Sequence, residues 1–88
     1  MNWACDLTAD AEKDLRELPR SIQARLTQVL DQLGASPFQG DVKPLKGREW
    51  KGVFRRRMGA YRILFTVNHK TRALLVLRIL LRSEKTYR

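Results

Sequence analysis

The sequence predicts a single α+β domain in which a helical hairpin packs on a small, mainly antiparallel, four-stranded sheet. Three observations predict it: a short alternating segment at the start, two segments with helical spacing of apolar residues, and three later segments typical of strands. The resulting order, β-α-α-β-β-β, sets a helical layer against a sheet. With 88 residues, 43% of them apolar, we expect one domain over residues 1–88 with one modest core.

The first strand and the first helix follow from the opening residues. Residues 2–7 alternate between two faces, which predicts a short strand. Its more apolar side is formed by Trp3, Cys5 and Leu7. Thr8 is suited to cap a helix, because Asp10 and Glu12 then lie in the first turn, beside the positive end of the helix dipole. Pro19 ends this helix and suits the first turn of the next one.

The second helix is predicted over residues 20–33. One face of this segment is apolar and is formed by Ile22, Leu26, Val29, Leu30 and Leu33. We expect Gly34 to act as the C-terminal cap, and Pro37 prevents the helix from continuing. Because the break between the helices is short, they should form an antiparallel hairpin. Residues 34–49, rich in glycine and proline, are predicted to be a polar loop.

Three strands complete the predicted sheet. Residues 50–58 form the first, and Gly59 and Ala60 make a tight turn into the second, residues 61–67. A polar turn at residues 68–71 leads to the third strand, residues 72–81. This last segment is almost continuously apolar, so we expect it to be central in the sheet.

The alternation along these strands predicts a basic face. Arg55 and Arg57 share one face of their strand, and Arg62 shares a face with Leu64 and Thr66. The opposite side of the second strand is more apolar and should face the helices, so Arg62 projects from the open side of the sheet. Arg78 and Arg82 have the same parity on the last strand. We therefore expect them to join this basic face.

Charge is divided unevenly along the chain. The net charge is +9, but residues 1–42 have a balance of −3 and residues 43–88 a balance of +12. Charge segregated in this way within one domain makes a positive surface that attracts polyanions. Nucleic acid, or an acidic protein partner, is therefore the expected class of ligand.

Several functional classes are excluded by composition. No apolar run approaches the ~18 residues that a membrane span requires, and the first residues lack the pattern of a secretory signal. Cys5 is the only cysteine, so no internal disulfide is expected and a cytoplasmic location is the simplest setting. Cys5 and the single histidine, His69, cannot build a zinc site on their own. We expect neither a metal nor another cofactor.

Three segments carry a resemblance to a known family. They are residues 41–47 (DVKPLKG), residues 55–65 (RRRMGAYRILF) after Trp50, and residues 82–88 (RSEKTYR). Together they resemble the RelE/ParE toxin superfamily, whose element order is also β-α-α-β-β-β. The resemblance implies either a RelE-like toxin, which cleaves messenger RNA in the ribosomal decoding (A) site, or a ParE-like toxin, which poisons DNA gyrase. Both kinds are neutralised by an antitoxin.

The RelE pattern implies specific site residues. It falls on Arg55 and Arg57, on Arg62 after the tyrosine of "GxY", on Arg82, and on Tyr87 beyond the last strand. Lys51 is a further basic candidate for the catalytic group. The predicted RNA-binding residues are Lys43, Lys46, Arg57, Arg78 and Arg88.

Two departures from the pattern bear on the chemistry. Ala60 stands where relatives often carry an acidic residue, and Leu81 stands where many have a histidine. Any mechanism must therefore work without histidine at the second position.

The chemistry implied is RNA cleavage without metal, in which the 2′-hydroxyl attacks its own phosphate. This path requires a base, positive charge on the phosphorane and an acid for the leaving oxygen. Arginine suits the second role, because its planar fork stays charged and donates two hydrogen bonds to phosphate. Our hypothesis is that Arg62 holds the phosphate, Arg55 and Arg82 add charge, and Lys51 or Tyr87 is the base. Tyr87 could instead stack on a base.

Three functions remain open from the sequence. The first is an endoribonuclease toxin acting with the ribosome on mRNA, opposed by a RelB-like antitoxin with an acidic or amphipathic segment. The second is a ParE-like gyrase inhibitor, and the third is a non-catalytic nucleic-acid-binding module that grips phosphates. Taken alone, the three consecutive arginines at 55–57 are also typical of a solvated edge strand.

Overall fold

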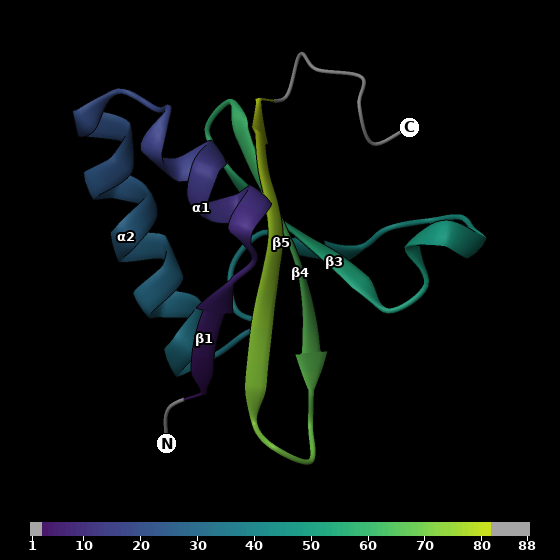
Figure 1. Cartoon of the computed structure of the whole chain (residues 1–88). Helices are drawn as coiled ribbons and strands as arrows, with labels where there is room; N and C mark the ends of the chain where they lie inside the picture. The colour runs from purple at the N-terminus through teal and green to yellow at the C-terminus, as the bar shows by residue number, and fades with distance from the viewer. Residues whose placement is uncertain (1–2, 82–88) are drawn as a thin grey trace.

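In the part of the chain that the structure describes, a five-stranded mixed sheet forms one layer and two helices form the other (Figure 1). The computed structural model describes residues 3–81. In chain order the elements are β1 (Ala4–Leu7), α1 (Ala9–Arg16), α2 (Arg20–Ala35), β2 (Val42–Pro44), the single-turn 3₁₀ helix η1 (Arg48–Trp50), β3 (Val53–Met58), β4 (Tyr61–Asn68) and β5 (Ala73–Leu81). The predicted α+β class and both predicted helices are confirmed.

The order of the strands in the sheet is β1-β5-β4-β3-β2. β1 runs parallel to β5, from Ala4 opposite Ala73 to Leu7 opposite Val76. The other three pairs are antiparallel, so the sheet is mainly antiparallel as predicted. β5 lies inside the sheet between β1 and β4, which agrees with its nearly continuous apolar sequence.

The start of α1 is fixed by Thr8. Its hydroxyl oxygen accepts a hydrogen bond from the N–H of Ala11, which is the cap that the sequence predicts. The same hydroxyl donates to the carbonyl oxygen of Leu77 at 2.8 Å, so the cap also ties the helix to β5. Pro19 lies at the N-cap of α2, with a φ of −56° that suits the helix entry.

The prediction for Gly34 was wrong. Gly34 is not the cap but a buried residue inside the last turn of α2, which continues to Ala35 and ends at Ser36. The N–H of Trp3 donates to the Gly34 carbonyl oxygen, and a Cβ at this position would lie 3.3 Å from the Trp3 carbonyl oxygen. Glycine is therefore explained by the close approach of two backbones and not by a left-handed cap.

The prediction of four strands and a polar loop over residues 34–49 was also incomplete. This loop contains β2, which pairs antiparallel with β3 and adds a fifth strand to the sheet. Trp50 was expected to begin a strand but lies in η1, and β3 begins only at Val53. Gly52, with a φ of +80°, makes the turn between η1 and β3 in a backbone conformation that L-residues avoid.

The main core lies between the helices and the sheet. β4 contributes Ile63 and Phe65, both fully buried, as predicted from the alternation along this strand. α2 contributes Leu26 and Leu33, which are also buried. Each such side chain contributes ~1.5–3 kcal/mol by leaving water, so this layer supplies most of the stabilisation. The helices therefore cover one face of the sheet.

Candidate nucleic-acid interface

Three arginines lie on the face of the sheet opposite the main core. Arg55 and Arg57 extend from β3, and Arg57 is directly opposite Arg62 on β4. Arg62 is in turn opposite Leu80 on β5. Like charges placed directly opposite each other on neighbouring strands destabilise a sheet. We call these three residues the arginine face, and their placement agrees with the sequence prediction.

Arg55 is the most enclosed member of the arginine face. It is a buried charged side chain, 7% exposed. In the register of the strands it lies between Lys43 on β2 and Leu64 on β4. A second basic group beside a buried guanidinium raises the local positive potential. The centre of this face therefore has a positive potential.

Arg57 has a carboxylate close by. Its Nε lies 3.5 Å from Oδ2 of Asp41, and both side chains are about 40% exposed. Asp41 is held there by its backbone, whose carbonyl oxygen accepts a hydrogen bond from the Arg57 N–H. An ion pair this exposed is worth at most ~1 kcal/mol, so it does not prevent Arg57 from binding an anion.

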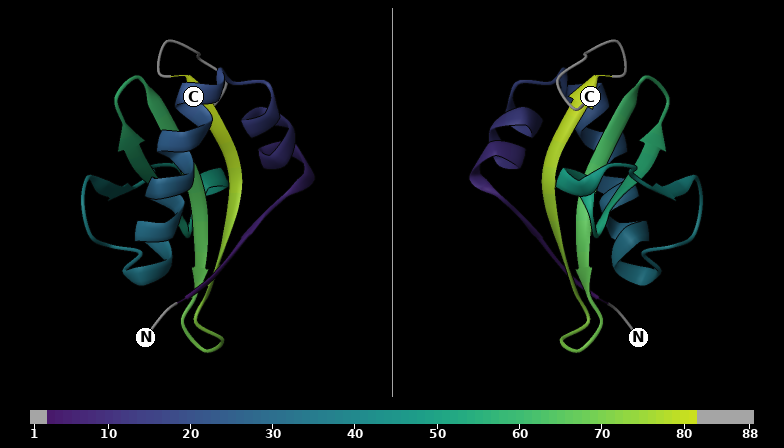
Figure 2. Two further views of the ribbon diagram at one scale, coloured as in Figure 1. Left: turned by 90° about the vertical axis from the view of Figure 1, so that its left-hand side faces the viewer. Right: turned by 90° about the vertical axis from the view of Figure 1, so that its right-hand side faces the viewer.

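A small apolar cluster forms the floor beside these arginines. Val53, Leu64 and Leu80 are buried there, and Leu45 and Trp50 pack against them. Figure 2, right, looks onto this part of the molecule from the side away from α2. The cluster anchors the segment that carries η1, which projects from the sheet in Figure 1.

The remaining basic candidates on this side are exposed. Lys43 lies on β2, Lys46 precedes η1, and Lys51 follows it as its C-cap. Gly47 has a φ of +103° and a ψ of 154°, a conformation essentially restricted to glycine, and it turns the chain into η1. These lysines extend the basic surface beyond the arginine face, with Lys51 at the end of a projecting turn.

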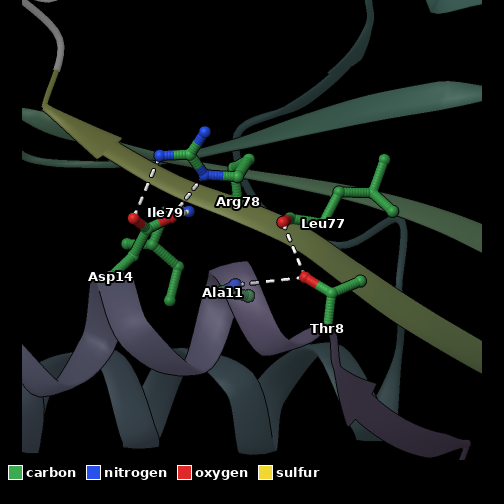
Figure 3. A network of polar contacts seen from close by, with 6 residues as sticks. All are labelled: Thr8, Ala11, Asp14, Leu77, Arg78 and Ile79. Carbon is green, nitrogen blue, oxygen red and sulfur yellow. Dashed lines mark hydrogen bonds and ion pairs between the residues drawn. The ribbon is translucent and has the colours of Figure 1, made fainter.

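Arg78 is opposite Leu64 on β4, the position that its parity predicts, but its guanidinium is bound by a carboxylate. A bulge between Leu64 and Phe65 shifts the register, so that Leu64 pairs with Arg78 but Phe65 pairs with Val76. The guanidinium of Arg78 donates to Asp14 of α1, from Nε to Oδ2 at 2.8 Å and from Nη2 to Oδ1 at 3.1 Å. Figure 3 shows this bidentate pair.

Asp14 was missed by sequence reasoning, although it holds the end of β5. Besides binding Arg78, its Oδ2 accepts a hydrogen bond from the N–H of Ile79 at 2.9 Å (Figure 3). Burial alone raises the pKa of Asp14, but the hydrogen bonds from Arg78 and Ile79 and the charge of Arg78 outweigh it, so that the pKa falls below its usual value. No periodicity marks a carboxylate that pairs with a strand 64 residues later.

Other predicted site residues lie outside the described part of the chain. These are Arg82, Tyr87 and Arg88. Within residues 3–81 no three histidine, cysteine, aspartate or glutamate side chains gather as metal ligands. None of the helices in that range has the length and apolar character that a membrane span needs.

The family of the chain is decided by a match along almost its whole length. Residues 6–86 match the model of the ParE toxin of type II toxin–antitoxin systems. The chain belongs to this family of toxins. The resemblance to the RelE/ParE superfamily that the sequence predicts is thereby confirmed.

Three similar proteins carry Rel names. The chain is 31% identical to Toxin RelG of Mycobacterium tuberculosis over 80 residues, which cover 90% of each protein. Its structure is similar to a chain in the toxin–antitoxin complex RelBE2 of M. tuberculosis, with a TM-score of 0.84, 28% identity, and coverage of 93% of this chain and 100% of that one. A chain of the RelE–RelB complex from Pyrococcus horikoshii gives a TM-score of 0.79 at 27% identity, with coverage of 96% and 99%.

Proposed function

We propose that this toxin is a metal-independent endoribonuclease that cleaves mRNA in the A site of the ribosome and so inhibits translation. The observation that carries the proposal is the arginine face, where Arg57 and Arg62 stand directly opposite each other beside the buried Arg55. Guanidinium groups donate paired hydrogen bonds to a phosphate group, whose charge is the one that cleavage must stabilise.

The residues would act as follows. The 2′-oxygen forms a bond to the adjacent phosphorus, and the bond to the 5′-oxygen of the next nucleotide breaks as that oxygen takes up a proton. The products are a 2′,3′-cyclic phosphate and a 5′-hydroxyl. Arg62 holds the phosphate, and Arg55 adds charge to the phosphorane. Arg82 would add further positive charge beside the phosphorane. Lys51 or Tyr87 would remove the proton from the 2′-hydroxyl. Lys43, Lys46, Arg57 and Arg88 are the proposed contacts to the rest of the RNA. Arg78 is a further proposed contact, because its side chain remains 42% exposed although Asp14 binds it.

The proposal includes a protein partner. The chains at 28% and 27% identity were solved in complexes named RelBE2 and RelE–RelB, which supports a RelB-like antitoxin here. An acidic or amphipathic segment of such an antitoxin would be attracted to the basic half of this chain, where the balance of charge is +12. The ribosome and mRNA are the targets, which places the toxin in the cytoplasm.

A second function is favoured by one specific observation. The family model that matches residues 6–86 is that of ParE toxins, for which the alternative action is inhibition of DNA gyrase. Under this alternative the arginine face would contact a protein or DNA without chemistry. The two functions differ in whether an RNA strand is cut.

The test is primer extension on a defined mRNA in a reconstituted translation system. We expect cuts that require ribosomes, and we expect Arg62→Ala to slow them by ~100-fold or more, as loss of a transition-state donor does. Tyr87→Phe should also slow them. Arg20→Ala is the matched control, because it removes the same charge from an exposed position on α2, and it should cut like the wild type.

Equal cutting by wild type and Arg62→Ala would remove Arg62 from the mechanism. Normal translation with no cuts by the wild type would contradict the proposal as a whole. In that case inhibition of gyrase supercoiling by the same protein would establish the second function.

A further inference from the structure

Four side chains, three of them exposed and one half-buried, form a patch at the end of the molecule near the β4–β5 turn. Trp3 precedes β1, Phe38 follows α2, and His69 and Arg72 belong to the turn between β4 and β5. We call them the aromatic patch. Three segments distant in sequence thus come together at one place, and the arginine face does not include any of them.

The rings of the patch are arranged in contact. His69 stacks on Phe38, with ring centroids 5.9 Å apart and an angle of 18° between the planes. Trp3 meets His69 edge to face at 5.7 Å. Phe38 also meets Phe54 of β3 at 5.2 Å, which connects the patch to the core. Despite these contacts Phe38 remains 45% exposed, so a large part of its surface faces water.

Arg72 completes the patch with a positive charge. Its guanidinium carbon lies 5.2 Å from the centroid of the Trp3 ring, within the range of a cation–π contact. Arg72 has a φ of +53°, the left-handed region, where a residue other than glycine costs ~1 kcal/mol. Glycine would fit this backbone without strain. A strained arginine is therefore an indication that its side chain has a use.

We propose that the aromatic patch binds single-stranded RNA by stacking a nucleobase on Phe38, with Arg72 and Lys70 contacting the adjacent phosphates. The choice of RNA as ligand rests on the proposed function. The patch offers what single-stranded nucleic acid requires, an accessible ring for the base and cations for the backbone. It is a second contact point on the side of the sheet where Phe54 and the main core lie, opposite the arginine face, and the six residues of β4 from Arg62 to Asn68 span about 20 Å.

Charge and side-chain type favour RNA over an apolar protein segment. The exposed side chains of the β4–β5 turn include Lys70 and Arg72, and the exposed large side chain of the patch is an aromatic ring. The exposed aliphatic side chains, Leu75 and Leu81, lie elsewhere on β5. An apolar partner would be expected to use aliphatic surface, whereas bases stack on rings regardless of sequence.

The experiment measures the affinity of the purified toxin for a fluorescent, twelve-nucleotide, single-stranded RNA by anisotropy. The probe is 2′-O-methylated, so that an attack by the 2′-hydroxyl cannot cut it. We expect Phe38→Ala to weaken binding about tenfold, the effect of losing one stacked base. Phe38→Tyr keeps a ring and should stay within about twofold of the wild type.

Arg72→Gly separates binding from folding. It relieves the left-handed backbone while it removes the charge, so the protein should unfold at no lower temperature than the wild type but bind the probe more weakly. Leu75→Ala is the matched control, because it removes an exposed side chain outside the patch, and it should bind like the wild type.

Wild-type affinity in both Phe38→Ala and Arg72→Gly would overturn the proposal, as would failure of the wild type to bind the probe. Weaker binding of the RelB-like antitoxin with unchanged RNA affinity would assign the patch to a protein partner and would also overturn it. These outcomes differ from failure of the proposed function, which is the absence of cuts in the translation assay.

Discussion

Replacement of Asp14 tests how the end of β5 is held. β1 pairs with β5 only as far as Leu7 opposite Val76, and the chain then turns into α1. Beyond this point the carboxylate of Asp14 provides the hydrogen-bond acceptor that a neighbouring strand would provide. It accepts hydrogen bonds from the N–H of Ile79 and from the guanidinium of Arg78. Asp14→Ala removes all of these hydrogen bonds and leaves the N–H of Ile79, a residue only 4% exposed, without its acceptor.

The size of the effect follows from these contacts. A hydrogen bond from a backbone N–H to a carboxylate contributes ~1.5–3 kcal/mol. The pair with Arg78, whose side chain is 42% exposed, adds less than ~1 kcal/mol because water screens it. We expect Asp14→Ala to lower the free energy of unfolding by about 2.5 kcal/mol, which is roughly 10–20 °C in Tm for a domain of this size. Asp14→Asn keeps one acceptor oxygen and should lose about half as much.

The same contacts predict a dependence on pH. The pKa of Asp14 is lower in the folded protein than its usual value of 3.8. The carboxylate therefore stabilises the fold fully above this value, and the stabilisation is lost as the pH falls through the lower, folded pKa. The difference in stability between wild type and Asp14→Asn should shrink when the pH is lowered from 7 to below the usual pKa of aspartate.

The assay is urea denaturation followed by far-UV circular dichroism at pH 7 and at pH 3. The control is Asp31→Asn, which removes a carboxylate from an exposed position on α2 and should change stability by less than ~0.5 kcal/mol. If Asp14→Ala unfolds at the same urea concentration as this control, the carboxylate does not hold the edge of β5 and the reasoning is refuted.

Two further substitutions test how local backbone features support the fold. Thr8→Ala removes the cap of α1 and the hydrogen bond to Leu77 and should cost ~1–2 kcal/mol in urea denaturation, whereas Thr8→Ser keeps a hydroxyl and should recover most of the loss. Gly47→Ala should lower the free energy of unfolding by ~1–3 kcal/mol, because the φ of +103° at this position is unfavourable for alanine. The control is Gly52→Ala, which also lies at positive φ but has open space around it, so it measures the cost of the backbone conformation alone. An unchanged melting temperature in Gly47→Ala would contradict the strain argument.

Much of the fold could be predicted because its signals are local. Thr8 and Pro19 mark helix boundaries by their own chemistry, and alternation along β4 distinguishes Phe65 from Arg62. β2 could not be predicted, because it has three residues, includes a proline and becomes a strand only by pairing with β3. The role of Gly34 depends on contact with Trp3, which no pattern in the sequence encodes.

The candidate site was predictable to the extent that it follows strand alternation. Arg55, Arg57 and Arg62 lie on one face for this reason. Alternation does not reveal that Asp14 of α1 binds the guanidinium of Arg78, because the two residues are 64 positions apart in the sequence. The aromatic patch could not be foreseen either, since His69 and Trp3 had no reason to be near Phe38 until the chain was folded.

The pairing of β1 with β5 determines when this toxin can fold. The first strand of the sheet must find a partner that is about 70 residues further along the chain, from Ala4 to Ala73. During synthesis β1 therefore has nothing to pair with until β5 has emerged, and β5 is also the strand on which β4 and α1 pack. A sheet closed by such a distant contact forms late, because the loop entropy must be overcome before the pairing stabilises the chain. The complete sheet is thus assembled only after β5 has left the ribosome that makes the chain.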